Sequence, residues 1–101
     1  MSLFKNLFGK PTDFKSIYEK GALILDVRTP AEFNAGHIKG AVNIPVGELK
    51  SHIADLKKKG QPIITCCLSG GRSEVARVTL AMQGLEVYNG GPWNGLERKL
   101  Q

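Results

Sequence analysis

The residues of this chain that could do covalent chemistry are concentrated in one short segment, Cys66-Cys67-Leu68-Ser69-Gly70-Gly71-Arg72-Ser73. A thiol that loses its proton is a strong nucleophile. The two glycines allow a loop whose N–H groups point inward, and a helix starting at Arg72 or Ser73 adds the positive end of its dipole. Such a loop holds an anion and lowers the pKa of a thiol at its start. The spacing therefore predicts a thiolate in an anion cradle, with Arg72 as an additional positive charge.

The two cysteines are neighbours in the chain, which limits what they can do together. Adjacent Cα atoms lie about 3.8 Å apart, whereas ordinary disulfides span about 4.4–6.8 Å. The two histidines, His37 and His52, match no zinc-binding spacing with the cysteines. We therefore expect neither a disulfide framework nor a metal site, and we predict a reducing, cytoplasmic location. Cys66 continues an apolar strand and is expected to be buried, whereas Cys67 is expected to face the loop.

Apolar runs alternate with helix-like segments along the chain, and this order predicts the α/β class. Strands are expected over 22–25, 41–44, 62–66 and 85–88, and helices over 13–20, 29–35, 48–59, 72–83 and 93–100. One helix start is especially well marked, because Thr29, Pro30 and Glu32 form a capping box with proline at the first position. Strands separated by helices imply a mainly parallel sheet covered on both faces. Ligands of such sheets bind where strand ends meet helix starts, as in the 66–73 segment.

Length and composition exclude several functional classes. The 101 residues suit a single domain over 1–101, in which residues 1–11 form an N-terminal extension. No apolar run approaches the 18 or so residues of a membrane span. The formal net charge is +5, but the basic residues do not alternate with aromatic residues, so nucleic acid is not an expected partner. The charge instead suits a protein that attracts small anions.

Three stretches of the chain, taken together, resemble the rhodanese-like sulfurtransferase family over about residues 13–93. The first covers 25–33 and 36–45. The second is Cys67–Ser73, which matches the family's Cys-x-Ser-Gly-x-Arg-Ser active-site loop. The third covers 87–91 and is followed by an aromatic residue, Trp93. The three stretches occur in the order that the family shows, which makes the resemblance more specific than any one of them.

The resemblance implies a three-layer sandwich, a mostly parallel sheet with helices on both faces. It implies that Cys67 attacks the sulfane sulfur of an anionic donor such as thiosulfate and becomes a persulfide, from which a thiol, a protein cysteine or cyanide takes the sulfur. No cofactor and no metal are implied. Loop N–H groups would hold the persulfide charge, and Arg72 would attract the donor. The implied substrate-binding residues are Leu68, Ser69, Gly70, Gly71, Arg72 and Ser73.

Two residues just past a buried strand are expected to support this site. Asp26 is expected to accept hydrogen bonds from backbone groups of the loop. Arg28 is expected to pair with Glu32 or with the loop. Both are interpreted as supporting residues rather than as groups that take part in the reaction.

Two alternatives remain open at this point. Counted from Cys66, the segment also matches the Cys-x5-Arg-Ser signature of protein tyrosine phosphatases, and a phosphatase or arsenate reductase would use Cys66 as its nucleophile. Thr65 stands where those phosphatases usually have histidine, and the glycine expected three residues after the cysteine is Gly70 when counted from Cys67. These features favour sulfur chemistry. A rhodanese-like domain can also serve as a non-catalytic sulfur-relay or binding module, although such forms typically lack the cysteine.

Overall fold

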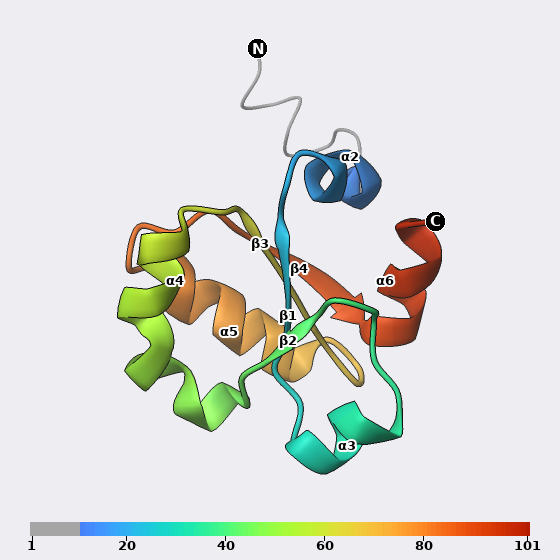
Figure 1. Cartoon of the computed structure of the whole chain (residues 1–101), viewed down its shortest axis with the longest axis horizontal. Helices are drawn as coiled ribbons and strands as arrows, with labels where there is room; N and C mark the ends of the chain where they lie inside the picture. The colour runs from blue at the N-terminus through green and yellow to red at the C-terminus, as the bar shows by residue number, and fades with distance from the viewer. Residues whose placement is uncertain (1–10) are drawn as a thin grey trace.

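The computed structural model describes residues 11–101, so all but the last residue of the predicted N-terminal extension lies outside the described residues. Within them, one parallel sheet contains β1 (Leu23–Asp26), β2 (Val42–Asn43), β3 (Ile63–Cys67) and β4 (Val87–Pro92). The strand order is β2-β1-β3-β4, so the strand that carries both cysteines lies inside the sheet (Figure 1). The carboxyl ends of the strands meet at one edge, where the predicted loop follows β3.

Helices cover both faces of the sheet, as Figure 1 shows. One face carries the 3₁₀ helix η1 (Val46–His52), α4 (Ile53–Lys59) and α5 (Gly71–Ala81). The other face carries α2 (Phe14–Glu19) and α6 (Trp93–Lys99), while α3 (Pro30–Ala35) follows the end of β1. Each face has its own buried cluster, because successive side chains of a strand point to opposite sides. The predicted α/β class and the three-layer arrangement are confirmed.

Most elements differ in their bounds from the sequence prediction by one or two residues, and three of the differences are instructive. The segment predicted as one helix over 48–59 begins at Val46 as 3₁₀ turns and becomes α-helical at Ile53. The last strand, predicted over 85–88, runs over 87–92. Its start is delayed because the N–H of Leu85 still donates to the carbonyl of Leu80 at 3.2 Å, in the turn that ends α5. The strand predicted over 41–44 covers only 42–43, ahead of Pro45, which has no N–H to continue the ladder.

Gly90 allows β4 to continue close beside β3. A β-carbon at Gly90 would lie 2.7 Å from Cδ2 of Leu96 and 2.9 Å from the carbonyl oxygen of Thr65. Both distances are shorter than real contacts of a β-carbon, so a side chain at this position would force the two strands apart. The close approach brings β4, including Asn89, beside the loop that follows β3.

Candidate active site

The two cysteines lie on opposite faces of β3. Cys66 belongs to the buried cluster of the α2 and α6 face, together with Ile24 and Leu96. Cys67 belongs to the cluster of the opposite face, together with Ala76 of α5. Both thiols are free and both residues are buried, with exposed fractions of 0% and 1%. The expected burial of Cys66 and the expected orientation of Cys67 toward the loop are confirmed.

The loop after β3 directs hydrogen-bond donors toward the sulfur of Cys67. The N–H of Gly70 lies 3.0 Å from Sγ and the N–H of Ser73 lies 3.4 Å from it. The hydroxyl oxygen of Ser73 lies 3.3 Å from the same sulfur. Gly70 has a φ of +105°, which a residue with a side chain rarely adopts, and α5 begins at the next residue. The sulfur is therefore held against the first turn of α5, where the helix dipole favours negative charge.

The pKa values of the two thiols shift in opposite directions. Burial raises the pKa of the Cys67 thiol, but hydrogen bonds from Ser73, Gly70 and Ser69 together outweigh burial and bring the pKa below its ordinary value. Burial and the nearby carboxylate of Asp26 raise the pKa of the Cys66 thiol to about 12. Of the two, Cys67 is the thiol with the larger thiolate fraction at neutral pH.

Arg72 lies beside the loop and is already paired. Its Nη1 and Nη2 donate to Oε1 and Oε2 of Glu32 at 2.8 and 3.0 Å. The N–H of Thr29 also donates to Oε1 of Glu32, so the predicted capping box of α3 is present and holds the carboxylate in place. These bonds, led by the one from Arg72, lower the pKa of Glu32 to about 2. Because about a third of each side chain of the pair is exposed, an incoming anion would compete with Glu32 for Arg72.

Asp26 and Arg28 are engaged with each other rather than with the loop. The Asp26 carboxylate accepts from Nε, Nη2 and the N–H of Arg28 at 2.9, 2.6 and 3.1 Å. Arg28 also donates to the carbonyl oxygens of Glu32 and Gly36 at 3.3 and 2.7 Å, and it lies 4.9 Å from the ring centroid of Trp93. The prediction that Asp26 accepts from loop N–H groups is therefore wrong, because Arg28 occupies its carboxylate. Arg28 reaches the backbone of Glu32 and not its carboxylate, which Arg72 occupies.

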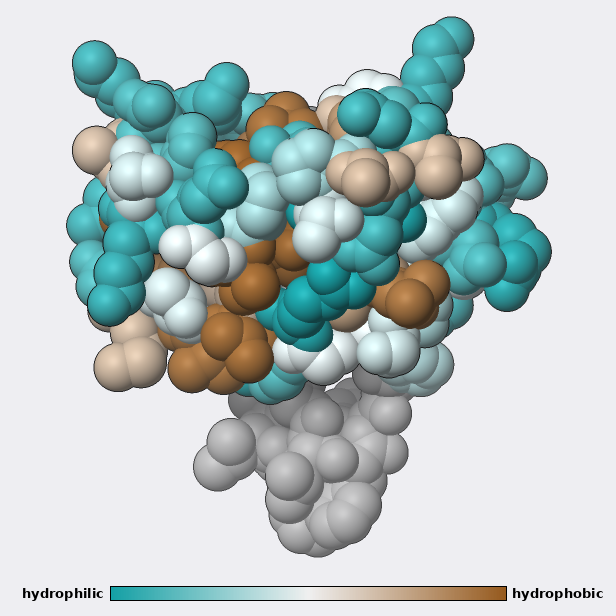
Figure 2. All heavy atoms as spheres, turned by 90° about the horizontal axis from the view of Figure 1, so that it is seen from below, coloured by the Kyte–Doolittle hydropathy of each residue, from teal (hydrophilic) through white to brown (hydrophobic). Residues whose placement is uncertain are grey.

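The outer surface of the loop is partly apolar. Leu68 is 60% exposed, and Ser69 beside it is also exposed. Figure 2 shows the molecule from below the view of Figure 1, the side on which α3 lies, with hydrophobic groups exposed among hydrophilic ones. The loop thus directs N–H groups inward toward the thiol and exposes an apolar side chain, Leu68, to solvent.

A family model for the rhodanese-like domain matches residues 10–92. The chain belongs to the rhodanese-like domain family. It is 36% identical over 92 residues to the thiosulfate sulfurtransferase GlpE of Ectopseudomonas mendocina, a match that covers 88% of this chain and 80% of GlpE. It is 41% identical over 78 residues to the uncharacterized protein YqhL of Bacillus subtilis, covering 76% of this chain and 60% of YqhL. The chain therefore spans less than two thirds of the length of YqhL.

The fold agrees with the same family. A solved structure of a rhodanese with anions from E. coli matches this structure with a TM-score of 0.68 and 30% sequence identity. The match covers 74% of this chain and 91% of that chain. The resemblance noted from the three sequence stretches is confirmed.

Two residues of this rhodanese-like site were not among the predicted site residues. Glu32 holds Arg72, although the sequence indicated only its capping role and a possible pairing with Arg28. Asn89 lies in the middle of β4, where its Oδ1 is 2.7 Å from Oγ of Ser73 and its Nδ2 is 3.3 Å from the carbonyl oxygen of Gly70. Both residues follow, or lie near, the carboxyl end of a strand of the same sheet, which is the signal that could have identified them.

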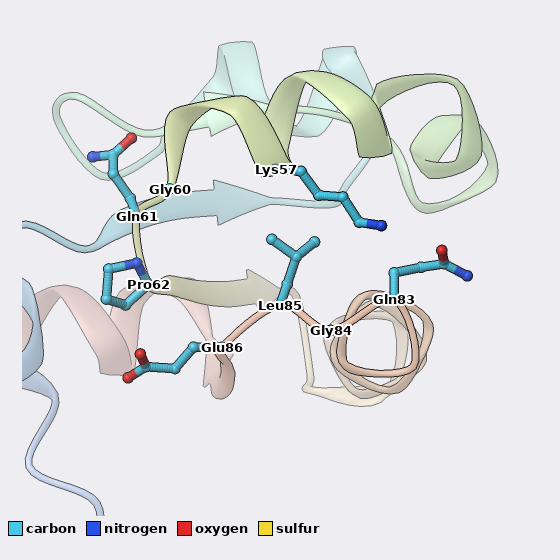
Figure 3. Close-up of a pocket in the computed structure, with 8 residues that line it drawn as sticks. All are labelled: Lys57, Gly60, Gln61, Pro62, Gln83, Gly84, Leu85 and Glu86. Atoms are coloured by element: carbon cyan, nitrogen blue, oxygen red, sulfur yellow. The ribbon is translucent and has the colours of Figure 1, made fainter.

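A separate hollow of about 280 Å³ lies at the opposite ends of the strands from Cys67. In Figure 3, the side chain of Leu85 points toward α4, with Lys57 and Gln83 on one side of it and Pro62 on the other. No three His, Cys, Asp or Glu side chains gather as metal ligands among residues 11–101. Within the same residues, every helix is too short or too polar to cross a membrane. The loop after β3 is therefore the best-supported candidate site in the described residues.

Proposed function

We propose that this chain is a sulfurtransferase that carries sulfane sulfur on Cys67. In the first step the Cys67 thiolate attacks the outer sulfur of thiosulfate, the S–S bond of the donor breaks, and sulfite leaves with the electron pair. In the second step a thiol or cyanide attacks the outer sulfur of the resulting persulfide, and the Cys67 thiolate leaves. A persulfide donor would react in the same way, with a thiolate as the leaving group.

The observation that carries this proposal is the convergence of N–H groups on the Cys67 sulfur. The N–H groups of Gly70 and Ser73, at 3.0 and 3.4 Å, stabilise the thiolate that begins the cycle and that leaves at its end. Burial of the site strengthens these bonds, because little water competes with them. The similarity to a thiosulfate sulfurtransferase supports the same class of reaction.

The phosphatase or arsenate reductase alternative is not supported by the site. It needs Cys66 as the nucleophile, but the Cys66 side chain belongs to the cluster of the opposite face of the sheet. The pKa of about 12 keeps the Cys66 thiol protonated at neutral pH. A thiol without loop donors and without its charge is a poor nucleophile.

The proposal extends to the surroundings of the reaction. We propose a small anionic donor and a thiol or protein-cysteine acceptor, with no cofactor. Two free cysteines and the thiolate chemistry suit a reducing compartment, which we take to be the cytoplasm. We also interpret residues 1–101 as one rhodanese-like domain.

The test is the formation of thiocyanate from thiosulfate and cyanide by the purified chain and by two cysteine variants. Cys67→Ser should reduce the rate to the level without protein, because the persulfide cannot form. Cys66→Ala is the matched control, chosen because a serine hydroxyl would be buried in an apolar cluster, and it should keep most of the activity. Activity that survives Cys67→Ser but not Cys66→Ala would overturn the proposal. Persulfide formation on Cys67 without turnover would instead indicate a sulfur-relay module.

A further inference from the structure

The orientation of the Asn89 side-chain amide is fixed by its partners. Its Oδ1 accepts from the N–H of Gly91 at 2.9 Å. Its Nδ2 lies 3.1 Å from Oε1 of Glu74 and 3.3 Å from the carbonyl oxygen of Gly70, both of which can only accept. A reversed amide would set oxygen against these two acceptors and nitrogen against a donor. The oxygen therefore faces Gly91, and also Ser73.

This orientation determines where the Ser73 hydroxyl proton lies when Cys67 is a thiol. Oγ of Ser73 is 2.7 Å from Oδ1 of Asn89, and an amide oxygen accepts only, so the hydroxyl donates to Asn89. A hydroxyl has a single proton. The lone pairs of Oγ are then available to the S–H of Cys67, which is 3.3 Å away. The carbonyl of Gly70, 3.0 Å from Oγ, already accepts from the N–H of Glu74 at 3.1 Å and from Nδ2 of Asn89 at 3.3 Å, so both of its lone pairs are engaged.

The same arrangement does not suit a thiolate, because the lone pairs of Oγ would face a negative sulfur. A thiolate needs the hydroxyl proton, and a rotation about the Cβ–Oγ bond of Ser73 would supply it at the cost of the bond to Asn89. We propose that the Ser73 hydroxyl is a two-position switch, donating to Asn89 while Cys67 is a thiol and to Cys67 while it is a thiolate. Asn89 is thus a positioning residue that competes with the thiolate for one proton.

The role of this switch in sulfur transfer rests on the proposed function. In the persulfide the charge lies mainly on the outer sulfur, so the inner sulfur no longer needs the hydroxyl proton, which returns to Asn89. Competition from Asn89 therefore raises the energy of the free thiolate relative to the thiol and the persulfide. A less stabilised thiolate is a stronger nucleophile toward the donor, because nucleophilicity rises with the pKa of the thiol.

Other charged groups near the thiol must stay unchanged while this switch is tested. They lie on the neighbouring strand β1, on the segment between β1 and α3, on α3 and on α5. They are Asp26, Arg28, Glu32, Arg72 and Glu74. The alanine variants below leave all of them in place, and the second thiol is removed by making every variant in a Cys66→Ala background.

The experiment is a double-mutant cycle between Asn89 and Ser73, read as the rate of Cys67 alkylation by iodoacetamide against pH. Asn89→Ala should free the hydroxyl for the thiolate, lower the thiol pKa, and raise the alkylation rate at pH 6 by about three- to tenfold, the effect of one hydrogen bond. In a Ser73→Ala background the same substitution should leave the rate within about twofold, because there is no proton to release. Equal changes in both backgrounds, or no change when Ser73 is present, would overturn the switch.

A second variant tests the switch in the opposite direction. Asn89→Asp keeps an oxygen for the N–H of Gly91 and for the Ser73 hydroxyl, and it holds that hydroxyl proton more tightly. Its second oxygen replaces Nδ2 opposite Glu74 and the carbonyl of Gly70, and its charge acts on Cys67 whether or not Ser73 is present. Only the change caused by Ser73→Ala within each background is therefore compared. The decrease in alkylation rate caused by Ser73→Ala should then be smallest with Asn89→Asp and largest with Asn89→Ala. A decrease of the same size in every background would contradict the proposal. These rates are measured without any sulfur donor, so a protein that fails to transfer sulfur still gives a clear answer about the switch.

Discussion

Cys66 and Cys67 are adjacent in the chain, equally buried and attached to the same strand, yet their surroundings differ in every chemical respect. Cys66 faces the side of the sheet covered by α2 and α6, where it packs in an apolar cluster and is close to the carboxylate of Asp26. Cys67 faces the side covered by α5, where the loop supplies N–H groups at 3.0 and 3.4 Å. The pKa of the first thiol rises to about 12, and that of the second falls.

The difference shows that burial alone does not determine the reactivity of a thiol. Burial raises the pKa of both cysteines, and it is the largest single influence on each. Only Cys67 has donors that overcome it, because the strand ends there and α5 begins four residues later. Two adjacent positions of one strand therefore hold different thiols, because successive side chains point to opposite faces. The Cys66 thiol packs in the core, and the Cys67 thiol has a lowered pKa.

The largest predicted effect is the selectivity of alkylation between the two thiols in the native protein. A lowered pKa means that the Cys67 thiolate is present above that pKa and is lost as the pH falls through it. The rate at Cys67 should therefore rise with pH and level off at a lower pH than the rate of an unperturbed cysteine. Cys66, with a pKa of about 12, should react more than about a thousandfold more slowly at pH 7. Mass spectrometry of the alkylated protein against time and pH measures both rates.

Two cysteine variants control this measurement. Cys67→Ser should remove the fast reaction, and Cys66→Ala should keep it with the same pH profile. Comparable rates at the two thiols in the native protein would contradict the comparison, as would a fast rate that depends on Cys66.

A smaller effect should follow from Glu32→Gln, which releases Arg72 from its ion pair. Arg72 is close to Cys67 and not to Cys66, so only one of the two thiols should respond. The unpaired guanidinium favours the thiolate of Cys67, so alkylation at pH 6 should be faster by less than about threefold, and the gain should shrink as salt is added. The effect is small because the pair is partly exposed and water screens its charges. The rate at Cys66 should not change.

Glu86→Gln is the matched control for this charge change. It removes one carboxylate just before β4, at the end of the strands opposite the loop. It should leave the alkylation rate of Cys67 unchanged. An equal increase in both variants would mean that net charge, and not the release of Arg72, is responsible.

The order of strands and helices could be predicted from the sequence because it depends on local patterns. The capping box at Thr29 and Glu32 is one such pattern, since both partners lie within three residues. The placement of the two cysteines on opposite faces of the sheet could also be predicted, from the alternation of side chains along β3 and from Gly70 in the loop. These features need no knowledge of how distant segments pack.

The partners of the site residues depend on contacts that the sequence does not display. Glu32 meets Arg72 across 40 positions, and Asn89 meets Ser73 across 16. Asp26 was expected to accept hydrogen bonds from the loop because it lies near the same edge of the sheet. Arg28, two residues away, occupies its carboxylate instead. Such competition between possible partners is resolved only when the side chains have definite positions.

The most direct test of the central claim is to locate the transferred sulfur. The protein is incubated with thiosulfate, freed of donor, trapped with iodoacetamide and digested with trypsin, which should release residues 60–72 with both cysteines in one peptide. Fragment ions that break the chain between positions 66 and 67 distinguish the two thiols. We predict one additional sulfur atom on Cys67 and none on Cys66. An additional sulfur on Cys66, or on neither residue, would contradict the assignment of Cys67 as the sulfur carrier.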